Sequence, residues 1–146
     1  MNYARIVTAA VVAWVVSIGI GFLVNEVLLR DLMLANAAAM RPQGEMVAKL
    51  PLGFAFLLVG FLAFAYAYAK GYEGGHGPME GVRFGVVVAL VVIGFGVIWQ
   101  YVVFPIDGAM AVAGVIDAIV ELAIYGAIVG AIYRPAAAGA GRKIRA

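Results

Sequence analysis

The stretch GVIDAIVELAIYGAIVG, residues 114–130, decides the fold of this chain. Its residues are apolar, aromatic or small, except for the two acids Asp117 and Glu121. No Lys or Arg lies between Pro105 and Tyr133, so the segment itself supplies no positive charge to balance the acids. A run of this length and composition is typical of a helix that crosses a membrane. Because a central acid costs about 2.5–3.5 kcal/mol on insertion scales, the two carboxyl groups need an explanation.

The composition of the whole chain agrees with a membrane protein. Of its 146 residues, 66% are hydrophobic and 12% are charged, whereas soluble domains carry about 25% charged residues. The chain has no cysteine and one histidine, His76. These counts exclude a disulfide framework, a zinc knuckle, a thiol nucleophile and a bis-histidine haem site within one chain.

Four apolar segments organise the chain, at about residues 6–29, 50–69, 84–106 and 108–133. Each is long enough to cross about 30 Å of hydrocarbon as a helix. The sequence therefore predicts an all-α fold, namely a polytopic membrane protein with a four-transmembrane-helix bundle. Residues 1–135 are expected to form this single domain, and residues 136–146 a basic cytoplasmic tail.

The loops give the orientation. An even number of spans places both termini on one side, and the basic residues divide unequally between the two sides. One side holds Arg5, Lys70, Arg83, Arg134, Arg142, Lys143 and Arg145, and the other holds Arg30, Arg41 and Lys49. The positive-inside rule predicts that both termini are cytoplasmic. A short interfacial helix is expected within residues 30–40, and a flexible glycine turn at residues 74–77, with Pro78 at the first position of the next helix.

The first and third segments share the pattern G-x-G-x-x-x-amide, which favours a fold of two similar helical hairpins. The glycines would allow close helix packing, and the amides would bond across helices or line the outer half of the bundle. The residues concerned are Gly19, Gly21 and Asn25 in the first segment, and Gly94, Gly96 and Gln100 in the third.

Asp117 and Glu121 are four residues apart and share one helix face near the centre of the bilayer. Two carboxylates so close together repel each other in a medium of low polarity, so we expect at least one to be protonated at neutral pH. A protonated acid can hydrogen-bond a neighbouring helix. An acid that water can reach can instead bind and release a proton or a cation. Both interpretations remain open, as does contact with a lipophilic ligand.

Gly126 and Gly130 form a small-xxx-small motif on the same segment, on the side opposite the acids. Close contact is expected there, either with another span or with a second subunit. Glu26 either pairs with Arg30 one turn later or lines an outward cavity with Asn25. No pattern of catalytic, metal-ligating or cofactor-binding residues is present, so we expect neither an enzyme nor a cofactor.

The stretch AKGYEGGHGPMEGVRFG, residues 69–85, and the end of the fourth segment, GAIVGAIYRP, residues 126–135, carry a resemblance. The chain resembles a group of small four-span bacterial membrane proteins that are known only as hypothetical proteins. The resemblance covers most of the chain. It implies four helices in a bacterial inner membrane, and it implies no function.

Three functions are compatible with the sequence. The first is a transporter- or channel-like protein in which Asp117 and Glu121 bind a proton or cation, with Asn25, Glu26 and Gln100 along the outer half. The second is a non-catalytic accessory or scaffold subunit whose protonated acids join helices. The third is a binder of a quinone, pigment or lipid. In each case we expect contact with the lipid bilayer, a homo-oligomer or a larger complex, and no nucleic acid.

Overall fold

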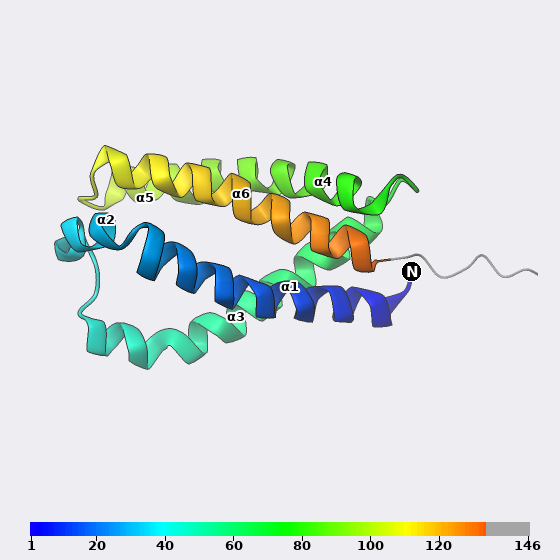
Figure 1. Cartoon of the computed structure of the whole chain (residues 1–146), viewed down its shortest axis with the longest axis horizontal. Helices are drawn as coiled ribbons and strands as arrows, with labels where there is room; N and C mark the ends of the chain where they lie inside the picture. The colour runs from blue at the N-terminus through cyan, green and yellow to red at the C-terminus, as the bar shows by residue number, and fades with distance from the viewer. Residues whose placement is uncertain (134–146) are drawn as a thin grey trace, which may run out of the picture.

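The computed structural model describes residues 1–133 of the chain (Figure 1). These residues form helices and turns, with no strand among them. Four helical segments are long and apolar enough to cross a membrane: Tyr3–Leu28, Gln43–Lys70, Gly77–Val103 and Gly108–Ile132. The predicted all-α four-helix bundle is therefore confirmed. The predicted basic tail at residues 136–146 lies outside the described residues.

The first hairpin contains the first two spans and the longest connection. Helix α1 (Tyr3–Leu23) continues into the π-helical turn η1 (Val24–Leu28). The connection folds into α2 (Arg30–Ala35), which is the short helix predicted there, and the 3-10 turn η2 (Ala37–Ala39). Helix α3 (Gln43–Lys70) is the second span.

The second hairpin has a similar plan and a shorter connection. Its first span consists of α4 (Gly77–Val92), the π-helical turn η3 (Ile93–Val97) and α5 (Ile98–Val103). Helix α6 (Gly108–Ile132) is the last span, and it begins where the Asp107 side chain accepts the Met110 N–H at 2.7 Å. In each hairpin, the first span thus contains a π-helical turn at or shortly after its G-x-G pattern.

Two helices begin ahead of the apolar segments that predict the spans. Helix α3 begins at Gln43, before the apolar segment at about residue 50, and Pro51 lies inside it. Hydropathy marks only the apolar part of a helix, whereas α3 extends into polar residues, with Glu45 in its first turn favouring the positive end of the helix dipole. Helix α4 begins at Gly77, so Pro78 lies in its first turn as expected, and Gly77 belongs to the helix and not to the preceding turn.

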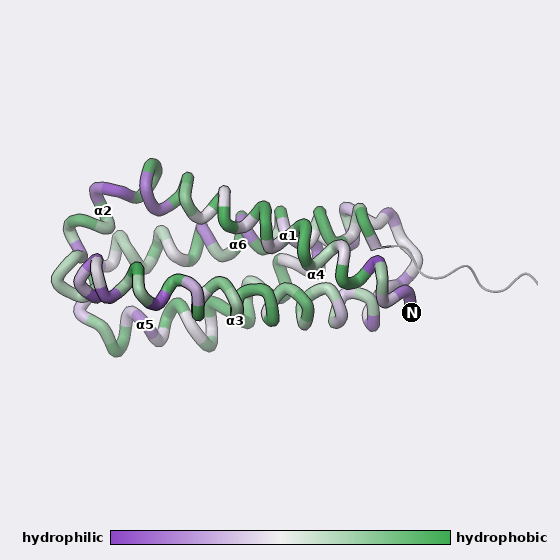
Figure 2. Tube along the Cα trace, turned by 90° about the horizontal axis from the view of Figure 1, so that it is seen from below, coloured by the Kyte–Doolittle hydropathy of each residue, from purple (hydrophilic) through white to green (hydrophobic). Residues whose placement is uncertain are grey.

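The helices pack in the order α3, α1, α6, α4 (Figure 1). Helices α4 and α6 are in contact along most of their length, whereas α3 packs on α1 and only touches α6. Figure 1 shows α3 crossing α1 and separating from α6 at the end where Asp107 lies. We name this the Asp107 end and the opposite one the Arg5 end. In Figure 2 the polar residues gather mostly at these two ends, as expected for helices that cross an apolar layer.

Glycine forms the contact between α4 and α6. Gly77, Gly81 and Gly85 of α4 follow each other at every fourth position, so they share one helix face. A Cβ atom added at Gly81 would overlap the carbonyl oxygen of Gly126, and one added at Gly77 would overlap that of Gly130. The two backbones therefore touch directly, which only residues without a side chain allow. The α6 half of this contact, Gly126 and Gly130, was predicted from its small-xxx-small motif, and the α4 half was not predicted.

The Arg5 end is closed by aromatic and small side chains. Ala9, Ala10 and Ala13 of α1 are fully buried, so α3 and α6 can both approach α1 closely there. The Tyr68 ring lies edge-on to Phe84 at 5.6 Å and to Tyr133 at 6.0 Å between ring centroids. Its hydroxyl group donates to the Gly77 carbonyl at 3.2 Å, while the Arg5 guanidinium donates to the Ile132 carbonyl at 3.2 Å.

The Asp107 end is held by one buried amide. Asn36, which is 5% exposed, lies between η2 and α2. Its Oδ1 accepts the Asp107 N–H at 2.9 Å, and its Nδ2 donates to Asp107 Oδ2 at 3.2 Å and to the Leu32 carbonyl at 2.9 Å. These bonds join the first loop to the start of α6. The sequence analysis did not identify Asn36, because nothing local distinguishes it from a solvated loop residue.

We expect Gly81→Ala to lower the free energy of unfolding by about 1–3 kcal/mol, because the added methyl group must push α4 away from α6. Thermal unfolding in detergent, followed by circular dichroism, would measure the loss. Gly53→Ala is the matched control, since nothing lies within 4 Å of its added Cβ and alanine favours the helix. Equal losses in the two variants would show that the α4–α6 contact is not tight.

We expect Asn36→Ala to destabilise the protein by about 1–3 kcal/mol, because it leaves the Asp107 N–H and carboxylate without their buried partner. Hydrogen exchange at the Asp107 amide should become faster in the variant. The control is Asn25→Ala, since the Asn25 amide is exposed and donates to the Gly21 carbonyl of its own helix at 2.8 Å. Unchanged exchange at Asp107 would contradict this role of Asn36.

Candidate functional site

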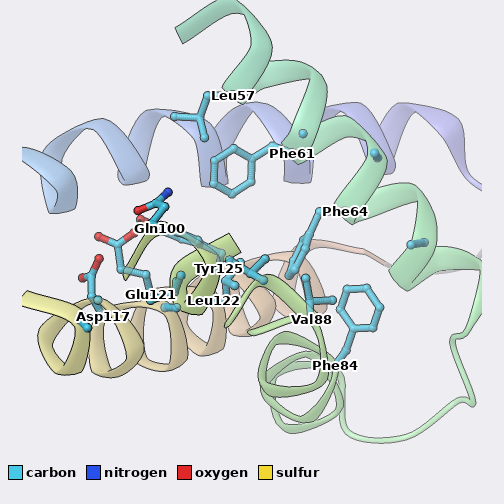
Figure 3. Close-up of a pocket in the computed structure, with 18 of the residues that line it drawn as sticks. Leu57, Phe61, Phe64, Phe84, Val88, Gln100, Asp117, Glu121, Leu122 and Tyr125 are labelled. Carbon is cyan, nitrogen blue, oxygen red and sulfur yellow. Dashed lines mark hydrogen bonds between the residues drawn. The ribbon is translucent and has the colours of Figure 1, made fainter. Parts of the chain in front are cut away.

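A large cleft lies where α3 separates from the α4–α6 pair (Figure 3). Its volume is about 750 Å³. Residues of α3, α4, η3, α5 and α6 line it, together with Ile106 from the turn before α6. We name it the acid cleft, and its lining residues used below are Leu57, Gly60, Phe61, Phe64, Phe84, Gln100, Ile106, Met110, Asp117, Glu121 and Tyr125.

The polar groups gather in one part of the acid cleft. Asp117 and Glu121 are partly buried and project from the same side of α6, as their four-residue spacing requires. Figure 3 shows both carboxyl groups pointing into the cleft, with the Gln100 side chain from α5 above them. The Tyr125 hydroxyl group donates to Glu121 Oε2 at 2.8 Å and orients that carboxyl group.

Aromatic rings form the other part of the cleft. The Phe61 ring meets the Tyr125 ring edge-on at 5.0 Å, and the Phe64 ring meets the Phe84 ring at 4.9 Å. Such edge-to-face pairs are worth about 0.5–1.5 kcal/mol beyond their burial, so these rings are held in place. Tyr125 joins the two parts, since its ring packs on Phe61 while its hydroxyl group binds Glu121.

The structure brings together three of the five predicted polar residues. Asp117, Glu121 and Gln100 line the acid cleft, whereas Asn25 and Glu26 are exposed elsewhere. Asn25 and Glu26 therefore do not belong to the acid cleft, and their role in an outer polar lining stays a prediction. The π-helical turn η1 and the bend at Leu29 separate Glu26 from the helix that Arg30 begins, so the two do not stack as they would one turn apart in a regular helix.

Of the six glycines predicted to pack against a neighbouring helix, two do so in the structure and four do not. Gly126 and Gly130 meet α4 of the same chain, so their face of α6 is covered without a second subunit. Nothing lies within 4 Å of a Cβ added at Gly19, Gly21, Gly94 or Gly96, and these four glycines form no close helix contact in the described part of the chain. Gly94 and Gly96 lie within the π-helical turn η3, and Gly19 and Gly21 lie shortly before η1.

The aromatic wall is the part of the site that the sequence analysis missed. Phe61, Phe64 and Tyr68 recur at helical spacing on α3, which is a visible pattern. Such a stripe is typical of ordinary packing, and most of it does pack at the Arg5 end. Phe61 and Phe64 line the same cleft as the two acids only because α3 is tilted away from α6.

The acid cleft offers few ligands to a metal ion. Within residues 1–133, no group of three or more His, Cys, Asp or Glu side chains is close enough to hold a metal. Hard divalent cations take six or more oxygen ligands, and two carboxyl groups with one amide supply fewer. The donor set of the described chain therefore suits a proton or a singly charged cation better.

A smaller hollow of about 320 Å³ lies over the loop between α3 and α4. Glu80 occupies the position that an anion would take there, because its carboxylate accepts the Glu73 N–H at 2.7 Å and the Gly75 N–H at 2.9 Å. The loop thus folds around a side chain of its own. The acid cleft is the stronger candidate for a functional site.

No known protein family matches the chain, and no curated protein or solved structure matches it either. The resemblance to small bacterial four-span proteins stays a prediction. The function is therefore argued from the geometry and chemistry of the acid cleft.

We expect the apolar reagent dicyclohexylcarbodiimide to modify Asp117 or Glu121 in membranes, because it adds to protonated carboxyl groups that are reachable from an apolar phase. Mass spectrometry of peptides from α6 would locate the adduct. A water-soluble carbodiimide should instead modify exposed acids such as Glu45 in the first turn of α3, whose side chain is 61% exposed. Labelling by the apolar reagent at such exposed acids alone would contradict a protonated, accessible pair.

Proposed function

We propose that this protein is transporter-like or channel-like and that Asp117 and Glu121 bind and release a proton or a small cation within the membrane. The observation that carries the proposal is that both acids open into a cleft of about 750 Å³ and are not packed between helices. An ionisable residue inside a membrane span that faces a cavity is the usual mark of an ion or proton pathway.

The hydrogen bonds support this function over a scaffold role. Acids that join helices must bond to a neighbouring helix. Glu121 instead accepts from Tyr125 of its own helix, and in the described chain no other helix donates to either carboxyl group. The contact that joins α6 to α4 is made by glycine, and the acids lie on a different face.

The extent of the cleft supports access from one side. Its lining runs along α6 from Met110 to Tyr125, which is about 22 Å of helix at about 1.5 Å per residue. Ile106, at the Asp107 end, belongs to the lining, whereas the tyrosine cluster around Tyr68 closes the Arg5 end. We propose that the site is reached from the Asp107 end, as in one state of an alternating-access cycle.

The location of the protein is part of the proposal. The distribution of basic residues favours cytoplasmic termini, which places the Arg5 end in the cytoplasm and the Asp107 end outside. The resemblance favours a bacterial inner membrane. Assembly into an oligomer or a larger complex stays a prediction, since α6 is covered by α4 and α1 of the same chain.

A second candidate is favoured by the walls of the acid cleft. Most of the lining is apolar or aromatic, as in sites that bind small organic ligands. A binder of a neutral lipophilic molecule would use these walls and one protonated acid as a hydrogen-bond donor. It would not need two acids on one face.

The test is a flux assay in liposomes with the purified chain. We expect proton or monovalent-cation flux to fall on the order of tenfold or more in the Asp117→Asn, Glu121→Gln double variant, which keeps shape and removes both exchangeable charges. Glu45→Gln is the control, because Glu45 is exposed and pairs with Arg41 at 3.7 Å. Equal flux in wild type and double variant, with both proteins folded, would end the proposal.

A further inference from the structure

We infer that the acid cleft takes a lipophilic organic cation, whose charge lies against Asp117 and Glu121 and whose apolar body lies against Phe61, Phe64 and Phe84. This inference rests on the proposed function and names the substrate class of the same site. The size, the walls and the charge of the cleft each contribute one argument.

The volume is the first argument. At about 750 Å³, the acid cleft lies within the range of about 300–1,000 Å³ that is typical of sites for organic ligands. A water molecule takes up on the order of 30 Å³ in the liquid, and a small dehydrated ion takes up less. A site for a proton or metal ion alone needs no cleft of this size.

The walls are the second argument. A hydrated inorganic ion gains nothing from the apolar side chains of α3 and α4 that face the acids across the cleft. An organic cation gains from burial of its apolar body and from the negative faces of aromatic rings, which attract a cation within about 6 Å of the ring centre. Four aromatic residues line the cleft, namely Phe61, Phe64, Phe84 and Tyr125.

The charge is the third argument. The acid cleft is lined by two carboxyl groups and, among the described residues, by no Lys, Arg or His. A cationic ligand can balance the negative charge of the two carboxyl groups, whereas an anionic ligand would be repelled by it. A neutral ligand could bond to one carboxyl group and would give no role to the other. Asp117 and Tyr125 are separated by about 12 Å along α6, at about 1.5 Å per residue. A ligand with a charged group and an aromatic body can therefore reach both parts of the cleft.

The experiment uses two probes of nearly equal shape and opposite charge, tetraphenylphosphonium and tetraphenylborate, with neutral triphenylphosphine oxide as a third. Binding to the purified full chain in lipid nanodiscs would be measured by isothermal titration calorimetry, against empty nanodiscs. We expect tetraphenylphosphonium to bind at least about tenfold more tightly than either of the other probes. We expect the Asp117→Asn, Glu121→Gln double variant to lose this preference.

A second variant tests the cleft itself. Gly60 lies on the cleft side of α3, and nothing is within 4 Å of a Cβ added there, so Gly60→Leu fills cleft space without a backbone clash. We expect it to weaken tetraphenylphosphonium binding by about tenfold. Gly53→Leu is the matched control, because Gly53 lies on the same helix, has the same free space and does not line the cleft.

The outcomes separate this inference from the proposed function. Equal binding of the three probes, or equal effects of Gly60→Leu and Gly53→Leu, would overturn the inference in favour of unspecific partition or a neutral ligand. No binding of tetraphenylphosphonium, combined with inorganic flux that depends on Asp117 and Glu121, would overturn the inference and leave the proposed function intact. Absence of both binding and flux would overturn the two together.

Discussion

The direct backbone contact between α4 and α6 determines how the rest of the molecule is arranged. Between apolar helices in lipid there is no hydrophobic driving force, so association depends on close packing, and Gly77, Gly81, Gly126 and Gly130 permit the closest approach available. This contact fixes the rotation of α6 about its axis. With its glycine face against α4, α6 presents Asp117 and Glu121 toward the space beside α3. The position of the acids is thus set by residues that carry no side chain.

Helix α3 then decides whether that space is filled. At the Arg5 end it is anchored by Tyr68, which packs on Phe84 and Tyr133, and α1 offers it a surface of alanines. Toward the other end it crosses α1 and separates from α6, while Asn36 secures the start of α6 to the first loop independently of α3. The helices are consequently packed closely at the Arg5 end and separated toward the other, and this separation makes room for the acid cleft between α3 and α6.

Much of the fold could be predicted from the sequence, because length and hydropathy are local properties. The four spans, the short helix before α3 and the shared face of Asp117 and Glu121 follow from composition and helical spacing alone. The start of α3 shows the limit of hydropathy, since a helix continues into polar residues beyond its apolar segment wherever its backbone bonds can continue. Glu26 shows another limit, because a π-helical turn changes the spacing on which the predicted pair with Arg30 depended.

By itself, the sequence determined that this is a four-helix membrane protein with two acids on one face of its last span and small residues on the other. Only the tertiary structure decided what those faces meet: glycines of α4 on one side, and an aromatic-walled cleft on the other. The physical reason is that helical spacing fixes which residues share a face, whereas the tilt and rotation of each helix follow from contacts between segments distant in the chain. Phe61 and Glu121 belong to one site because α3 diverges from α6, and no local pattern in the sequence predicts that divergence.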